Sequence, residues 1–333
     1  MPGTVVTIGN FDGVHRGHAT LIERARDLAR PTGSEGSRVV ALSFDPHPKS
    51  VLRPGTEPER LTTFAQRSRL LRDAGADEVL RLEPDSGLLG MSPTGFLKHI
   101  HESFSPKAMV EGADFHFGKG RSGHIDELRM IGDRLGFAVE VVEPVEVVLG
   151  DDSIVTASSS IARWLLAHGR VRDAAIVLGR LHEVTGEVVR GDRRGRGLGF
   201  PTANVRTQQV APDAGVYACI AVLPGGAEVP AAVHVGERPT IGDGAHRVEA
   251  HLLGLPTSFG NGSAPDAWSP VGELPEYGWG IALRFVSRLR DPIGFGSLER
   301  LRDQLSRDCA RAAERLESEC SASARSAGDR ETA

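Results

Sequence analysis

Apolar positions in the first half of the chain form short runs that alternate with segments of helical periodicity. The runs predict buried strands at 4–9, 39–44, 78–82, 108–111, 138–142 and 146–149. Apolar residues recur every three or four positions after residue 20 and again at 64–74 and 93–104, which predicts helices between the strands. Strands that alternate with helices favour parallel βαβ units, and therefore a doubly wound sheet that binds ligands at the carboxyl ends of its strands.

The pattern changes in the second half. Two further helices are predicted at 158–167 and 171–178, and then short β-rich runs follow at 185–189, 216–223, 231–235, 248–253 and 280–286. Turns separate these runs, which indicates an antiparallel barrel or sandwich. An amphipathic helix is predicted at 298–316. We therefore expect one domain at 1–178, a second at 179–318, and a small, polar, disordered tail at 319–333.

Composition narrows the class of protein. A chain of 333 residues has room for two domains. A net charge of -5 and only 5% aromatic residues disfavour a nucleic-acid-binding surface. Three widely spaced cysteines suggest neither a zinc site nor a disulfide framework. With no secretory pattern and no apolar run long enough to span a membrane, we expect a cytoplasmic protein without membrane partners.

The strongest motif follows the first predicted strand, where residues 9–18 read GNFDGVHRGH. A helix that begins there offers unpaired backbone N–H groups and a partial positive charge, both suited to phosphate. His15 and His18 are three residues apart and share one helix face, so both imidazoles can stabilise charge that develops on a triphosphate. The motif is neither a P-loop nor a dinucleotide-binding fingerprint. Gly17 leaves room for a nucleotide against the helix.

Three other segments carry polar groups suited to nucleotides. Residues 158–163 read SSSIAR, in which serine hydroxyls at a helix start and an arginine one turn later can bind phosphate. Residues 195–204 read GRGLGFPTAN, a glycine-rich turn whose backbone can wrap phosphates. Glu249 lies on a predicted strand that reads VEAHLL, facing the opposite way from its two apolar neighbours.

These motifs resemble a known family. The GNFDGVHRGH segment is similar to the HxGH nucleotidyltransferases, and specifically to the FMN adenylyltransferase module of bacterial bifunctional riboflavin kinase/FAD synthetases. FDPHP at 44–48 and GADFHFG at 112–118 agree with it. PTAN at 201–204 and VEAH at 248–251 resemble riboflavin kinases. The resemblance implies an α/β Rossmann-like nucleotidyltransferase domain followed by an antiparallel β-barrel riboflavin-kinase domain with a C-terminal helix.

The resemblance also implies roles for individual residues. The catalytic groups are expected to be His15, His18, Arg163 and, as general base of the kinase, Glu249. ATP contacts in the adenylyltransferase are expected at Gly9, Asn10, Phe11, Asp12, Gly17, Asp114, Ser159 and Ser160. ATP contacts in the kinase are expected at Gly191, Gly197, Gly199, Thr202 and Asn204, with Thr202 and Asn204 also holding Mg²⁺. Arg290 and Phe295 are the expected flavin contacts.

The implied reactions make FAD from riboflavin. ATP phosphorylates riboflavin to FMN, and a second ATP adenylylates FMN to FAD with release of pyrophosphate. The implied partners are therefore the small molecules riboflavin, FMN and ATP, with no nucleic acid, and a monomer or weak homo-oligomer is expected. Because the FMN phosphate is already ionised at neutral pH, the second reaction needs no strong base.

The sequence departs from the family pattern in three places. Ser160 and Ala162 replace the usual Thr and Ile, Arg238 replaces an Asn, and 254–276 is a longer Gly/Pro/Ser stretch where a flavin lid is expected. One alternative is therefore an FMN or flavin-analogue adenylyltransferase whose second domain binds flavin with weak or no kinase activity. Two others are a nucleotidyltransferase for another substrate, such as a coenzyme A precursor, and a nucleotide-responsive nucleic-acid binder.

Overall fold

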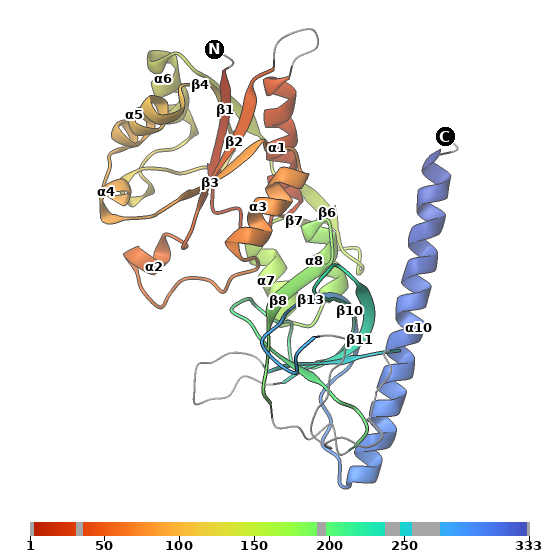
Figure 1. The fold of residues 1–333 in the computed structure, drawn as a ribbon. Helices are drawn as coiled ribbons and strands as arrows, with labels where there is room; N and C mark the ends of the chain where they lie inside the picture. Colours follow the sequence, from red (N-terminus) through yellow and green to blue (C-terminus); the bar gives the residue numbers. More distant parts are fainter. Residues whose placement is uncertain (1–2, 31–35, 192–197, 237–246, 255–273, 332–333) are drawn as a thin grey trace. The chain divides into compact units, whose positions relative to one another are not determined.

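The computed structural model describes residues 3–30, 36–191, 198–236, 247–254 and 274–331 (Figure 1). The chain folds into two compact units, which we describe separately. The first comprises Met1–Ala162 with Val177–Gly179, and the second comprises Arg163–Ile176 with Arg180–Ala333. The chain therefore enters the second unit after residue 162, whereas one boundary was predicted at residue 178. It crosses back to the first unit only for residues 177–179, so the units exchange a short segment. Backbone contacts explain the exchange, because the Asp213 amide donates to the carbonyl of Leu166.

The first unit contains the predicted doubly wound sheet. Five parallel strands lie in the order β3-β2-β1-β4-β5. Their bounds are Thr4–Gly9 (β1), Arg38–Phe44 (β2), Glu78–Leu82 (β3), Pro106–Gly112 (β4) and Ala138–Val142 (β5). The chain leaves β1 toward β2 on one side and returns from β3 to β4 on the other. The switch point of the sheet, where such folds bind ligands, is thus at the carboxyl ends of β1 and β4.

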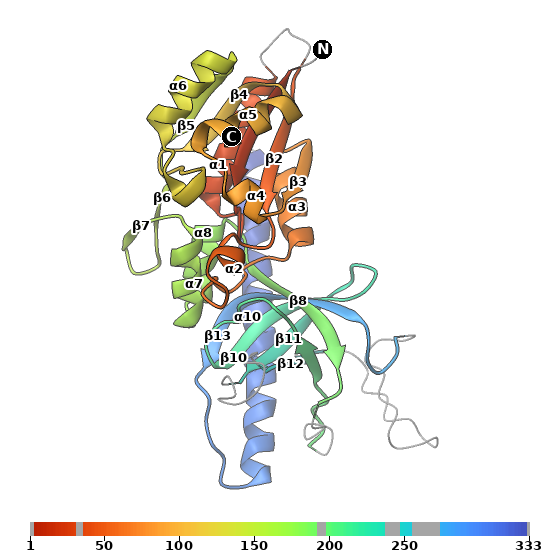
Figure 2. The same ribbon diagram turned by 90° about the vertical axis from the view of Figure 1, so that its left-hand side faces the viewer.

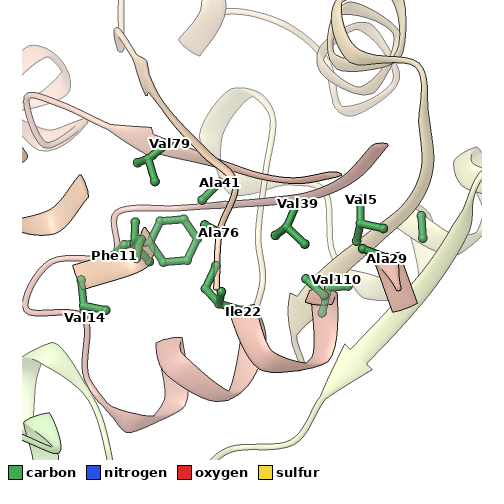
Figure 3. Packing of buried hydrophobic residues seen from close by; sticks show 13 residues of the cluster. Val5, Phe11, Val14, Ile22, Ala29, Val39, Ala41, Ala76, Val79 and Val110 are labelled. Carbon is green, nitrogen blue, oxygen red and sulfur yellow. The ribbon is translucent and has the colours of Figure 1, made fainter. Parts of the chain in front are cut away.

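Helices cover both faces of this sheet. Val5 and Val39 point to one face, where they pack against Ile22 of α1 (Arg16–Ala29) and Leu71 of α3 (Phe64–Asp73). Figure 3 shows this cluster from close by. The opposite face packs against α4 (Ser86–Leu89), α5 (Pro93–Phe104) and α6 (Ile125–Leu135). Burial on both faces explains why the strands are continuous apolar runs. Two short helices, α2 (Lys49–Leu52) and η1 (Lys119–Arg121), lie in loops.

The predicted strand at 146–149 lies outside the sheet. It forms β6 (Glu146–Val148), which pairs antiparallel with β7 (Ile154–Thr156) in a separate two-stranded ribbon. The reason is the short connection from β5, since a parallel neighbour requires a crossover of about a dozen residues or more. Two helices then follow, α7 (Ser159–Ala167) and α8 (Val171–Leu178), close to their predicted bounds.

The second unit is built on a closed barrel, which confirms the predicted barrel fold. The order is β10-β11-β12-β9-β8-β13, and each described pairing between these strands is antiparallel. Their bounds are His182–Val189 (β8), Ala203–Arg206 (β9), Gly215–Val222 (β10), Glu228–Val235 (β11), Val248–Leu252 (β12) and Gly280–Arg290 (β13). Strand β9 was not predicted, because its alternating pattern extends over only four residues, ANVR. Figure 2 shows the barrel from the side.

The C-terminal helix is longer than predicted. Helix α10 runs over Leu298–Glu331, so the tail predicted to be disordered continues the helix as far as Glu331. The physical reason is composition, since residues 319–331 contain one glycine and no proline and can extend a helix already nucleated. Its middle part packs on the barrel through Ala312 and Leu316, which lie against Val216 and Leu289.

Candidate active sites

The turn after β1 has an unusual backbone. Phe11, Gly13 and Val14 all have positive φ values, of 48°, 82° and 39°. Non-glycine residues rarely adopt this region, and each such residue costs on the order of 1–3 kcal/mol unless its surroundings impose it. Gly9 also permits the turn, because a Cβ there would lie 3.2 Å from the Phe11 ring, which folds back over it. Strain of this kind concentrates at functional sites.

Asp12 is the residue that imposes this conformation. Its carboxylate accepts hydrogen bonds from the backbone amides of Leu61 and Thr62, both at 3.0 Å, and from the Thr62 hydroxyl at 2.9 Å. The same hydroxyl oxygen accepts from the Gly13 amide at 3.0 Å. Asp12 is buried, and Arg67 lies 3.7 Å from its Oδ1. The structure thus gives the Asp12 side chain a different role from the predicted ATP contact, because its oxygens hold the turn to residues 61–62.

Arg67 is a residue that sequence reasoning missed. Its guanidinium is buried and donates to the Ser43 hydroxyl at 3.1 Å and to the Phe44 carbonyl at 2.8 Å. The Ser43 hydroxyl in turn donates to the carbonyl of Asn10, whose side chain is exposed, at 3.3 Å. Nothing in the sequence distinguishes Arg67 from Arg69 and Arg72 of the same helix. Together these contacts connect the end of β2 to the turn.

The two motif histidines lie against each other. His15 precedes the first residue of α1, and its ring stacks on that of His18 with a centroid distance of 3.6 Å and an interplanar angle of 28°. The edge of the Phe11 ring meets His18 at 5.2 Å. A Cβ on Gly17 would lie 3.2 Å from the His15 ring and 3.5 Å from the Ala157 carbonyl oxygen. Gly17 therefore makes room for the His15 ring, whereas the sequence suggested room for a nucleotide.

The serine motif lies beside the same turn. The Ser159 hydroxyl donates to the Asp12 carbonyl at 2.7 Å, which brings the start of α7 to the histidine motif. Ser158 caps the helix, since its hydroxyl accepts from the Ile161 amide at 3.2 Å. Ser160 is exposed, and Arg163 follows it by one turn, in the part of α7 that belongs to the second unit.

Two carboxyl groups lie at the carboxyl end of β4, next to the switch point. Asp114 is exposed, and its carbonyl is hydrogen-bonded to Nδ1 of His116 at 2.7 Å. Glu111 is buried, and it accepts a hydrogen bond from the Ile8 amide at 2.8 Å. Burial raises the pKa of Glu111 well above its ordinary value, the Ile8 hydrogen bond opposes this, and nearby Asp114 adds to it. Sequence reasoning did not identify Glu111, because it reads as part of an apolar strand.

In the barrel, two of the predicted kinase residues, Asn204 and Glu249, lie side by side. Glu249 on β12 is directly opposite Asn204 on β9 and, on its other side, opposite His234 on β11. Opposed residues of antiparallel strands point to the same face with Cβ atoms about 4.5–5.5 Å apart. Because Val248 and Ala250 are buried in the barrel, this row of three polar residues faces outward. The Arg247 guanidinium lies 3.4 Å from Glu249.

A cavity of about 450 Å³ opens beside Asn204, and Arg247, the ion-pair partner of Glu249, also lines it. It is lined by Val189, Arg190, Gly191, Asn204, Val205, Arg247 and Val248. Two arginines suit the phosphates of a nucleotide, and neither was among the predicted site residues. Gly191 is required here, because a Cβ would lie 2.2 Å from the Asn204 amide nitrogen. Thr202 comes just before β9, Gly199 is exposed, and Gly197 lies outside the described residues.

The predicted flavin residues, Arg290 and Phe295, lie at the end of β13 and shortly after it. Arg290 donates through Nε to both carboxylate oxygens of Asp308 at 3.0 Å, and through a terminal nitrogen to one of them at 2.6 Å. The Phe295 ring centroid is 5.8 Å from the Arg290 guanidinium carbon. Arg290 therefore fastens β13 to α10, and its donors are occupied within the protein. Arg238 and residues 255–273, the greater part of the unusual 254–276 stretch, lie outside the described residues.

The fold defines a class of two-unit proteins in which a doubly wound α/β unit is joined to a closed antiparallel β-barrel. Family models for FAD synthetase and riboflavin kinase match residues 1–157 and 178–316, respectively. The bifunctional riboflavin kinase/FMN adenylyltransferase of Escherichia coli K12 is 31% identical, over 92% of this chain and 90% of that protein. The Pseudomonas fluorescens protein of the same name is 34% identical, over 93% and 92%.

The chain belongs to the family of bifunctional riboflavin kinase/FMN adenylyltransferases. It is a bifunctional transferase of FAD biosynthesis that uses ATP and flavins as substrates. A crystal structure described as a macrolide-efflux protein from Streptococcus pneumoniae is also similar, with 27% identity, a TM-score of 0.75 and coverage of 92% of both chains. Within the described part of this chain, no helix combines the length and apolar character that membrane crossing requires.

Proposed function

We propose that each unit carries out one of the two reactions, with the residues described above in defined roles. The α/β unit directs attack to the α-phosphorus of ATP, and the barrel directs attack to the γ-phosphorus. The observation that carries this division is the placement of two separate polar clusters, the stacked pair His15–His18 and the row Asn204–Glu249, in different units.

In the adenylyltransferase, an oxygen of the FMN phosphate attacks the α-phosphorus and pyrophosphate leaves. His15 and His18 stabilise the charge that develops on the phosphates, as donors fixed in place before the reaction begins. The backbone amides at the start of α1, together with Ser160, bind the triphosphate. The contacts of Asp12 and Ser159 support an indirect role for both side chains, which hold the turn and α7 in place.

In the kinase, Glu249 accepts the proton from the terminal ribityl hydroxyl while the oxygen attacks the γ-phosphorus and ADP leaves. Arg190 and Arg247 line the cavity and bind the phosphates. The oxygen donors Thr202 and Asn204 suit Mg²⁺, a hard cation that keeps several waters and shares substrate phosphates. When bound, Mg²⁺ supplies charge neutralisation on the phosphates.

Product analysis by chromatography tests this division. The protein is incubated with riboflavin, ATP and Mg²⁺, and FMN and FAD are quantified. We expect His15→Ala with His18→Ala to lower FAD formation at least about 10²-fold while FMN still accumulates. Glu249→Gln should stop FMN formation, yet FAD should still form when FMN is supplied.

The matched control for Glu249 is Glu187→Gln. Glu187 is an exposed carboxylate on β8, which β9 separates from β12; it pairs with Arg206 at 2.7 Å, and its loss should leave both products unchanged. Equal loss of both activities in either site variant would refute the division. Absence of FMN with the unaltered protein would instead favour a flavin-binding barrel without kinase activity.

A further inference from the structure

Glu111 lies at the point where strands β1 and β4 separate. The parallel pairing between these strands runs through Val5↔Ala108 and ends at Val6↔Met109. Two residues further along, the same register would bring Ile8 opposite Glu111. The Glu111 carboxyl instead accepts the hydrogen bond of the Ile8 amide at 2.8 Å. A side chain therefore replaces the backbone acceptor that a continued ladder would supply.

On the other side of β1 the ladder continues to the end of the strand. Gly9 still pairs with Ser43 of β2, so β1 stays attached to β2 while it parts from β4. The Glu111 side chain is 1% exposed, and a buried carboxyl is costly unless a specific interaction retains it. Glu111 lies at the switch point of the sheet. It is hydrogen-bonded to Ile8, the residue before Gly9, and it comes three residues before Asp114.

We propose that Glu111 is a positioning residue of the adenylyltransferase, which acts through the Ile8 amide to fix the end of β1 and the histidine turn relative to β4. The residues after Ile8 form the strained turn that leads into His15, so a displaced Ile8 displaces the histidines. Displacement of catalytic groups by about 1 Å can cost about 10²-fold in rate. The inference rests on the proposed role of the histidines in FAD formation.

Two variants of similar size separate the hydrogen bond from the volume of the side chain. Glu111→Gln keeps an oxygen acceptor for the Ile8 amide, whereas Glu111→Met fills the space without one. We expect Glu111→Met to lower kcat/KM for FAD formation from FMN by about tenfold or more, and Glu111→Gln to restore it to within about threefold. Glu140→Met is the matched control, because Glu140 lies on the adjacent strand β5 and pairs with Arg24 near the surface.

FMN formation by the barrel, measured on the same samples, reports that the second unit is intact, and hydrogen exchange of peptides from β1 and β4 reports whether the α/β unit is folded. A purely structural role would lower the thermal midpoint of Glu111→Met without changing kcat/KM of the folded enzyme. Unchanged FAD kinetics in Glu111→Met, or a loss in Glu111→Gln as large as in Glu111→Met, would overturn the inference. If the histidine double variant kept its FAD activity, the proposed site would fail instead, and the two failures are therefore distinguishable.

Discussion

Asp308 accepts three hydrogen bonds from the Arg290 guanidinium and so ties the first half of α10 to the last strand of the barrel. The Asp308 side chain is only 2% exposed, and Gln304 donates a further hydrogen bond to it at 2.9 Å. A buried pair of this kind is expensive to break from one side, because the remaining charge is left without its partner.

We expect Asp308→Asn to destabilise the barrel unit by about 3–5 kcal/mol. Tryptophan fluorescence during urea unfolding measures this, since all three tryptophans of the chain come after residue 162 and Trp164 and Trp279 lie in the second unit. Asp303→Asn, an exposed position on the same helix, is the control. An unchanged stability accompanied by a higher KM for riboflavin would contradict this role and restore Arg290 as a flavin contact.

Gly191 gives a second prediction. A Cβ at this position would lie 2.2 Å from the Asn204 side chain, so Gly191→Ala must displace Asn204 from the cavity. We expect FMN formation to fall by about tenfold or more, because the phosphate and metal contacts move, while FAD formation from supplied FMN is unchanged. Gly280→Ala tests for a general effect of alanine in the barrel, as a Cβ there meets nothing within 4 Å. Equal loss in both variants would count against a specific role of Asn204.

Gly17 gives the corresponding prediction for the other site. A Cβ would press on the His15 ring at 3.2 Å, with the Ala157 carbonyl behind it at 3.5 Å, so the stacked histidines must shift. We expect Gly17→Ala to lower kcat for FAD formation by about tenfold, although alanine favours a helix more than glycine does. FMN formation in the same sample is the internal control. A variant more stable than the parent with full FAD activity would show that the ring position is unimportant.

The sequence predicts the fold well where each element has its own pattern. The five parallel strands come from apolar runs, and the barrel comes from short β-rich runs separated by turns. Strand β9 was missed because residues 203–206 are held by pairing with β8 and β12, which local propensity does not reveal. Strand β6 was assigned to the sheet because a single strand pattern does not specify its partner, and β7, only three residues long, was not predicted.

The candidate sites were predicted less completely. Motif residues such as His15 and Glu249 are recognisable by type and spacing, but a motif does not show which of its side chains faces the ligand. Asp12 is a case in point, because its oxygens bind residues about fifty positions away. Arg67 stands among polar helix residues and Glu111 in an apolar strand, and the roles of both depend on long-range contacts that only the folded chain reveals.

The buried carboxyl of Glu111 makes the stability of the α/β unit depend on pH. Its pKa in the folded protein is well above the ordinary value of 4.5, mainly because of burial. Between these two pKa values the folded protein keeps a proton that the unfolded chain releases, so stability falls as the pH rises through that window. Glu111→Gln carries no titrating proton and keeps the Ile8 hydrogen bond. We therefore expect it to gain stability over the parent by about 1.4 kcal/mol for each pH unit within the window.

Hydrogen exchange of peptides from β1, β2 and β4 measures this difference, because the α/β unit contains no tryptophan among residues 1–162. Subtracting the two proteins cancels the titration of every other group, provided that the pH is varied identically for both. Glu140→Gln, whose carboxylate is near the surface, should follow the parent at each pH. A stability difference between Glu111→Gln and the parent that stays constant from pH about 5 to 8 would mean that Glu111 titrates alike in both states. Burial would then impose no penalty on its charge, and the carboxylate that accepts the hydrogen bond of the Ile8 amide would have to be ionised.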